Sequence, residues 1–308
     1  MDILGHQPIW RLLRNSAEHG KVSHAYLFLG PERVGKKTIA LEFIKFLNCQ
    51  DKNFENRPCC SCQSCRDLEK KSHPDFLLIK PEPDKKEISI SQIRNLAWQL
   101  SLQRYYSPFK AVIIDEAHLM NQEAQSCLLK TLEEPKGQAI IILVTAFPEL
   151  LFSTIISRTK RIRFSRVANK EIEDFLKAKK ISEKEIQKLI SIGWGRPGEI
   201  MGFLDNPEKL REREEKIKEL EKLIGSPLNI RFEYAKKIAQ DYRQVKEILD
   251  IWLEYFRNKL FSLIGKPDEK ESFLKFKKII NLIQDINFLL SKTETNPALA
   301  LEVLFMEI

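Results

Sequence analysis

The sequence predicts an α/β domain with a mainly parallel sheet, followed by an all-α region. Short apolar runs alternate with helical patterns through about residue 165, and the strand signal stops after Ser165. Such alternation favours a parallel sheet with helices on both of its faces. A phosphate-binding loop pattern also follows the first apolar run directly, as a sheet domain of the P-loop type requires.

The expected strands are short apolar or β-branched runs bounded by turn residues. They cover His24–Leu29, Asp75–Lys80, Lys110–Asp115, Ala139–Thr145 and Lys160–Phe164. Apolar residues at helical spacing predict the intervening helices Lys36–Leu47, Ser91–Leu102, Asn121–Glu134 and Leu150–Ser157.

Beyond the sheet, helical patterns alone continue, and turn residues divide them into two groups. The first group comprises three short helices, Ala168–Ala178, Glu183–Ile192 and Pro197–Leu204. After the breaker Asn206-Pro207, the second comprises Glu208–Leu223, Arg231–Ala239, Val245–Ile264, Ser272–Leu290 and Pro297–Met306. We therefore expect three domains, over residues 1–166, 167–206 and 207–308.

The loop between the first strand and the first helix has all but one residue of the P-loop pattern Gly-x4-Gly-Lys-Ser/Thr. Gly30, Gly35 and Lys36 have the required spacing, but Lys37 stands where a hydroxyl would bind Mg²⁺. Like charges about 4 Å apart cost on the order of 4 kcal/mol per unit charge at an effective dielectric constant of about 20. Thr38 is a poor substitute because it lies about 100° further round the helix. The loop is a candidate nucleotide site, and we expect no independent hydrolysis.

Two acids and a threonine at strand ends are further candidate nucleotide-site residues. Asp115 and Glu116 end an apolar strand, where the first would orient Mg²⁺ and the second would polarise an attacking water. The other interpretation is a buried strand followed by two solvated acids at a turn. Thr145, at the end of another apolar run, is either a polar group for the γ-phosphate or a plain strand cap.

Four closely spaced cysteines indicate a structural metal site. Cys49 precedes Cys59-x-x-Cys62-x-x-Cys65, and four thiolates complete the tetrahedral coordination of Zn²⁺ without an open catalytic position. Cys60 is an adjacent alternative to Cys59 as a ligand. Free thiols in a loop are the other interpretation.

A single arginine, Arg158, stands between the last predicted helix of the sheet domain and its last strand. One interpretation is a surface or salt-bridged side chain. The other is an arginine finger that stabilises the γ-phosphate of a nucleotide in a neighbouring subunit. Composition does not choose between them.

Composition narrows the class of protein and its partners. The 308 residues include 51 Lys and Arg against 43 Asp and Glu, a net charge of +8 that favours polyanionic partners. No apolar stretch approaches the ~20 residues that span a bilayer. We expect a cytoplasmic protein, in which cysteines are thiols or metal ligands.

These elements together resemble the AAA+ clamp-loader family of bacterial DNA polymerase III over essentially the whole chain. The segments that carry the resemblance, besides the loop and the cysteines, are Ile3–Gln7, His24–Phe28, Leu128–Pro135, Thr154–Arg158 and Asn296–Glu302. The resemblance implies an AAA+ P-loop (RecA/Rossmann-like) domain with a zinc module at about residues 49–66, a small helical lid and a C-terminal helical collar. It also implies that Arg158 acts in trans on the ATP of an adjacent motor subunit.

Two departures separate the chain from the family's motor subunits. Lys37 replaces the magnesium-binding hydroxyl. The segment Gly195-Arg196-Pro197-Gly198 has a glycine where the lid helix of the motor subunits has a sensing arginine, and Arg196 is close to that position but shifted from it. The resemblance therefore implies a stator subunit with a weak or absent ATPase activity and no polymerase activity of its own. Its partners would be the tau/gamma motor subunits and the delta subunit, with primed DNA and the sliding clamp reached through the complex.

Two alternatives stay open. One is an ATP-hydrolysing motor subunit of the same assembly, because Asp115 and Glu116 are retained. The other is a stand-alone P-loop enzyme acting on nucleic acid.

Overall fold

The computed structural model describes residues 3–83, 85–134, 137–264, 269–292 and 295–308. The chain forms two compact units, Met1–Met201 and Gly202–Ile308. The expected division into three domains stays a prediction.

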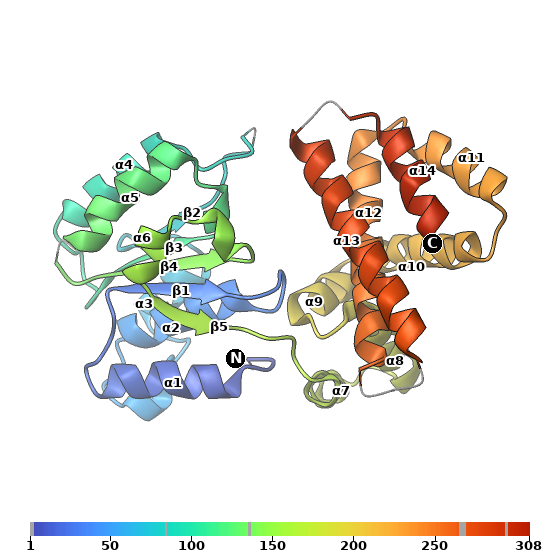
Figure 1. Ribbon diagram of the computed structural model, residues 1–308. Coiled ribbons are helices and arrows are strands. Elements are labelled where there is room, and N and C mark those ends of the chain that lie inside the picture. Colours follow the sequence, from blue (N-terminus) through green and yellow to red (C-terminus); the bar gives the residue numbers. More distant parts are fainter. Residues whose placement is uncertain (1–2, 84, 135–136, 265–268, 293–294) are drawn as a thin grey trace. The chain divides into compact units, whose positions relative to one another are not determined.

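A five-stranded parallel sheet forms the centre of the first unit (Figure 1). Its spatial order is β2-β3-β4-β1-β5, so β2 and β5 are the edge strands. The strands are β1 Ala25–Leu29, β2 Phe76–Ile79, β3 Lys110–Ile114, β4 Ala139–Thr145 and β5 Lys160–Arg163. All five predicted strands are confirmed, to within one residue at each end.

Alternate residues of β1, β2, β3 and β4 enter two separate cores, which explains their near-continuous apolar runs. On β1, Tyr26 and Phe28 point to one core, and Leu27 and Leu29 point to the other. The first core contains side chains of α1 Gln7–Glu18, α2 Lys36–Asn48 and α3 Gln63–Glu69. The second contains side chains of α4 Ile90–Ser101, α5 Gln122–Glu133 and α6 Ser153–Ser157. The predicted coverage of both faces is therefore confirmed.

Two helices of this unit were absent from the sequence prediction. Helix α1 buries Leu13 and Ala17, which are four residues apart on one face. Helix α3 is seven residues long, too short for a periodic signal, and its N-cap is Cys62, whose sulfur accepts from the Cys65 amide. The predicted helix at Leu150–Ser157 is instead a 3₁₀ turn, η3 Pro148–Leu150, followed by the shorter α6.

Helices alone follow β5 in the described residues. They begin with α7 Asn169–Ala178, α8 Glu183–Gly193 and α9 Pro197–Asp205, the last of which crosses the boundary between the two units. The second unit continues with α10 Pro207–Ile224, α11 Leu228–Ile238, α12 Tyr242–Ser262, α13 Lys270–Lys292 and α14 Pro297–Glu307. Trp252, Phe256 and Phe305 are buried at its centre. The α/β plus all-α fold class is confirmed.

No helix among the described residues combines the length and the apolar character that crossing a bilayer requires.

Candidate functional site

The loop between β1 and α2 adopts a conformation that depends on two glycines. Gly30 and Gly35 have φ angles of 144° and 101°, in the region that side chains with a Cβ avoid. A Cβ on Gly30 would also lie 2.3 Å from the carbonyl oxygen of Phe164. Strand, glycine loop and helix therefore follow one another as a phosphate-binding loop requires.

Lys36 is buried at the start of α2 and forms hydrogen bonds with the backbone of this loop. Its ammonium donates hydrogen bonds to the carbonyls of Gly30 (2.6 Å) and Pro31 (2.5 Å). Burial lowers the pKa of Lys36 to about 8, against the opposing influence of Glu32 and Asp115. The lysine is thus held at the loop, with a charge that depends on pH near neutrality.

Lys37 forms an ion pair with Asp115 across the site. Its Nζ lies 2.6 Å from Oδ2 of Asp115, which directly follows β3. The carboxylate that the sequence assigns to Mg²⁺ therefore has an ammonium as its partner. Thr38, the nearest hydroxyl along the chain, is exposed to solvent.

Glu116 follows with a left-handed backbone, φ 51° and ψ 44°. Burial raises the pKa of Glu116, and the nearby charges of Asp115 and Glu32 raise it further. The carboxyl is thus a better proton acceptor than a solvated glutamate.

Thr145 ends β4 and is buried. Its hydroxyl accepts from the Phe147 amide (3.0 Å) and lies 3.2 Å from Nδ1 of His118. Burial lowers the pKa of His118, which favours a neutral ring, and the tautomer of that ring sets which of the two atoms donates the hydrogen bond. His118 was not among the residues singled out from the sequence, because it has no ligand spacing with another histidine.

Residues distant in sequence form hydrogen bonds and an ion pair with Arg33 and Val34 of the loop. His6 donates from Nε2 to the Val34 carbonyl (2.8 Å), and the Gly198 amide donates to the Arg33 carbonyl (2.8 Å). The Arg33 guanidinium also pairs with Glu199 at 2.8 Å. These two carbonyls are therefore bonded within the protein. The first amides of α2 have no acceptor within the helix and are the groups that would bind an anion.

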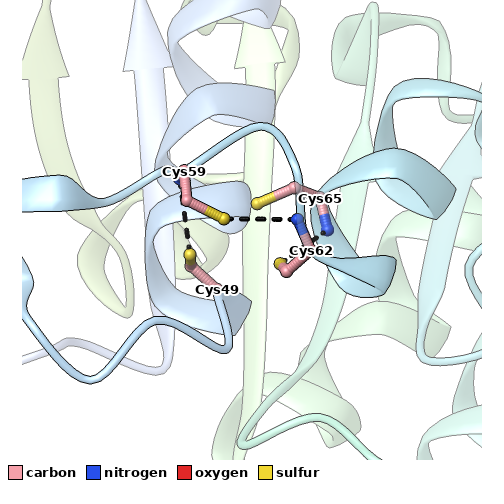
Figure 2. Close-up of side chains that lie close together, drawn as sticks. All are labelled: Cys49, Cys59, Cys62 and Cys65. Carbon is pink, nitrogen blue, oxygen red and sulfur yellow. Dashed lines mark hydrogen bonds between the residues drawn. The ribbon is translucent and has the colours of Figure 1, made fainter.

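A four-cysteine cluster lies between the end of α2 and the start of α3 (Figure 2). The sulfur atoms of Cys49, Cys59, Cys62 and Cys65 all lie within 4.8 Å of one another. Zn–S bonds of about 2.3 Å place tetrahedral sulfurs about 3.8 Å apart, so the set matches a metal site after a small contraction. Cys60 is exposed and directs its thiol to the Pro58 carbonyl, outside the cluster.

Backbone amides bond to three of these sulfurs. The Cys59 amide donates to Cys49, the Cys62 amide to Cys59 and the Cys65 amide to Cys62, at 3.3–3.4 Å. A hydrogen bond from Ser61 is the main cause that lowers the pKa of Cys59 to about 6, whereas burial raises the pKa values of Cys49 and Cys65. Amide donors stabilise thiolates, the form that binds metal.

A buried charge cluster attaches this module to the sheet domain. The Lys45 ammonium on α2 pairs with Glu42 at 3.0 Å and with Glu69 on α3. Lys45 is 0% exposed and Glu42 is 2% exposed.

Arg158 lies at the opposite end of the sheet from the phosphate-binding loop. It caps α6 just before β5, whereas the loop follows the far end of β1, which is parallel to β5. Lys160 is in register with Tyr26, and the amide of Phe164 bonds to Leu29. The four residue steps between Lys160 and Phe164 span about 13 Å at about 3.3 Å per residue.

The Arg158 side chain is held at the surface. Its guanidinium pairs with Glu133 at 2.7 Å and donates to the Thr154 carbonyl at 3.1 Å. The side chain is 38% exposed. Glu133 belongs to the family-like segment Leu128–Pro135, of which Pro135 lies outside the described residues.

The parallel sheet, with its glycine loop on β1 and its helical continuation, defines the class of this protein as an α/β protein of the P-loop type followed by helices. The family model described as "DNA polymerase III, delta subunit" matches residues 5–168, and the chain belongs to this family. The delta' subunit of Bacillus subtilis is 32% identical over 257 residues, which cover 83% of this chain and 72% of the relative. The tau subunit of the same organism is 34% identical over 171 residues, 56% of this chain and 30% of tau.

The longer match to delta' favours the delta' type of clamp-loader subunit over the tau/gamma type. A delta' subunit of Pseudomonas aeruginosa is also 34% identical, over 49% of this chain and 45% of that protein. Among solved structures, a gamma subunit-related protein of Thermotoga maritima is similar at a TM-score of 0.44 and 16% identity, over 96% of this chain and 97% of that one. The resemblance stated from sequence is confirmed at the level of the family.

Proposed function

We propose that this chain is the stator of a DNA polymerase III clamp loader and lends Arg158 to the nucleotide of an adjacent motor subunit. The observation that carries the proposal is the position of Arg158 at the end of the sheet opposite its own phosphate-binding loop. A strand's length of about 13 Å separates the two ends. The guanidinium is therefore available to a neighbouring chain rather than to its own site.

The surroundings of Arg158 suit a side chain that changes partner. Exposed ion pairs contribute about 0–1 kcal/mol, so the pairing with Glu133 is readily exchanged for a phosphate. A guanidinium is always charged and presents a planar fork of donors to phosphate oxygens. In phosphoryl transfer, such a cation supplied in trans is worth about 10³–10⁵ in rate.

The proposed partners follow from this role. The motor neighbours would be tau/gamma-type subunits, with a delta subunit completing the complex, and the primed DNA and sliding clamp would be reached through the assembly. We propose a cytoplasmic complex that acts in DNA replication. The net charge of +8 is compatible with DNA as a partner of the assembly.

We propose Zn²⁺ as the structural metal of the four-cysteine cluster. Four sulfur ligands favour zinc over the oxygen-preferring cations. Purified protein is expected to contain about one zinc per chain by elemental analysis. Metal-free protein in which residues 49–66 resist proteolysis as well as in the zinc-loaded form would contradict the proposal.

A second candidate, an ATP-hydrolysing motor subunit, is favoured by the retained Asp115 and Glu116. The ion pair between Lys37 and Asp115 weighs against it, because the carboxylate is engaged by a protein cation. Saturable ATP turnover by the isolated chain would support this candidate and remove the stator role.

The stator role is tested by Arg158→Ala in the reconstituted clamp loader. DNA-stimulated ATPase activity is expected to fall, while assembly measured by gel filtration stays intact because the Arg158–Glu133 pair is exposed. Arg161→Ala is the matched control, since Arg161 is an exposed arginine on β5. Equal ATPase rates for the two variants would remove the role of Arg158.

A further inference from the structure

In the P-loop of this chain, a lysine ammonium occupies the position of the hydroxyl that would bind the metal. Lys37 is the second residue of α2, at the position where the P-loop pattern has a hydroxyl. Its ammonium lies 2.6 Å from Asp115, and the two side chains are 41% and 19% exposed. The pair joins the loop to the end of β3, across 78 residues of sequence.

The residues present do not fit the Mg²⁺ ion that the fold family implies. Mg²⁺ takes oxygen ligands in a near-ideal octahedron and is held in P-loop sites by the loop hydroxyl and an acidic residue. Here the hydroxyl is replaced by an ammonium, which donates hydrogen bonds and binds no metal. The acidic residue is the partner of that ammonium, and Thr38 is exposed on a different side of the helix.

The capacity to bind phosphate is nevertheless retained in the loop. The first helical amide of α2 to close a backbone hydrogen bond is that of Ile39, to the Gly35 carbonyl at 3.0 Å. The amides before it, at the N-terminus of α2, have no acceptor within the helix. Lys36 is buried beside them and adds a second cation.

We propose that the Lys37 ammonium acts as a tethered replacement for the metal, so that this loop takes a nucleoside di- or triphosphate free of Mg²⁺. This inference is independent of the role proposed for Arg158 and requires only that the loop Gly30–Thr38 is a phosphate site. It goes further by naming the ligand form, a metal-free polyphosphate. A stator that binds nucleotide without metal holds it without hydrolysing it.

The charges of the site set the direction of the metal dependence. Lys36 and Lys37 contribute two positive charges, and Asp115 and Glu116 contribute two negative ones. A metal-bound triphosphate brings a dication towards Lys37, which repels it. The free polyphosphate brings no cation and is attracted by the two ammonium groups and the loop amides, while the charge of Asp115 is offset by its pair with Lys37. Magnesium is therefore expected to weaken nucleotide binding here, the opposite of its effect at a motor site.

The test is isothermal titration of the full chain with ATP and with ADP, once in excess EDTA and once in excess Mg²⁺. We expect measurable binding in EDTA and an affinity at least about tenfold lower in Mg²⁺. Wild-type protein that binds either nucleotide more tightly with Mg²⁺, or that binds neither in EDTA, overturns the proposal. Neither result bears on the proposed role of Arg158, which is tested separately through the DNA-stimulated ATPase activity of the complex.

Two variants make the test specific to Lys37. Lys37→Thr restores the loop hydroxyl and releases Asp115, so its ATP affinity is expected to rise at least about tenfold when Mg²⁺ is added. Lys37→Met releases Asp115 without adding a hydroxyl and is the matched control, in which both the metal-free binding and the gain with Mg²⁺ are lost. Equal metal responses in Lys37→Thr and wild-type protein would overturn the assignment, and circular dichroism verifies that each variant is folded.

Discussion

Lys45 is a buried cation whose removal tests the buried charge pair that α2 carries beside the cysteine module. In Lys45→Met the side chain keeps its approximate volume, but Glu42, which is 2% exposed, loses the ammonium 3.0 Å away. Removing one partner of a buried pair typically costs about 3–5 kcal/mol because the other charge stays buried. Glu69 is half exposed and is expected to contribute little to this loss.

The magnitude is limited by the alternative open to Glu42, which is to take up a proton. A glutamate with an ordinary pKa of about 4.3 costs about 3.7 kcal/mol to protonate at pH 7, because each pH unit is worth about 1.36 kcal/mol. At pH 5 the same step costs only about 1 kcal/mol. The destabilisation by Lys45→Met is therefore expected to shrink from about 3–4 kcal/mol at pH 7 to about 1 kcal/mol at pH 5.

The assay is amide hydrogen exchange of α2, which reports the free energy of opening of that helix at each pH. The double variant Lys45→Met/Glu42→Gln removes the buried charge and is expected to recover most of the loss at pH 7. Lys70→Met, at an exposed position beside α3, is the control and is expected to stay within about 0.5 kcal/mol of wild type. A loss of equal size at pH 5 and pH 7, or no recovery in the double variant, would refute this electrostatic account.

Three further predictions concern the site residues. The pKa of Lys36 in the free protein is about 8, so its charge is present below that pH and is lost above it. Nucleotide affinity measured by titration is therefore expected to fall as the pH rises through 8. An affinity that stays constant between pH 7 and 9 would contradict this. Cys62→Ser is expected to reduce bound zinc per chain in elemental analysis, whereas Cys60→Ser, outside the cluster, leaves it unchanged, and equal loss in both would place the metal elsewhere. Glu133→Gln weakens the hold on Arg158 and is expected to lower the stability of the isolated chain, measured by thermal unfolding, by no more than the effect of an exposed pair, about 0–1 kcal/mol; a larger loss would mean that the pair supports the fold.

Local patterns were enough to predict most of the fold. The strands were predictable because a parallel sheet buried on both faces needs continuous apolar runs, as in Ala139–Thr145. Helix α3 was missed because two turns carry too little periodicity. Its contacts include the hydrogen bond from the Cys65 amide to the Cys62 sulfur and the ion pair of Glu69 with Lys45 on α2.

The site divides along the same line. The glycine loop, the four cysteines and the family resemblance could be identified from residue types and spacing, because these groups act through neighbours in the chain or through a shared metal. The pairings of Lys37 with Asp115 and of Arg158 with Glu133 could not, because each joins residues that only the packing of strands and helices brings together. Arg158 and the loop lie at opposite ends of the sheet because β1 and β5 are parallel neighbours. The pairing of these two strands is a tertiary feature that local sequence patterns do not specify.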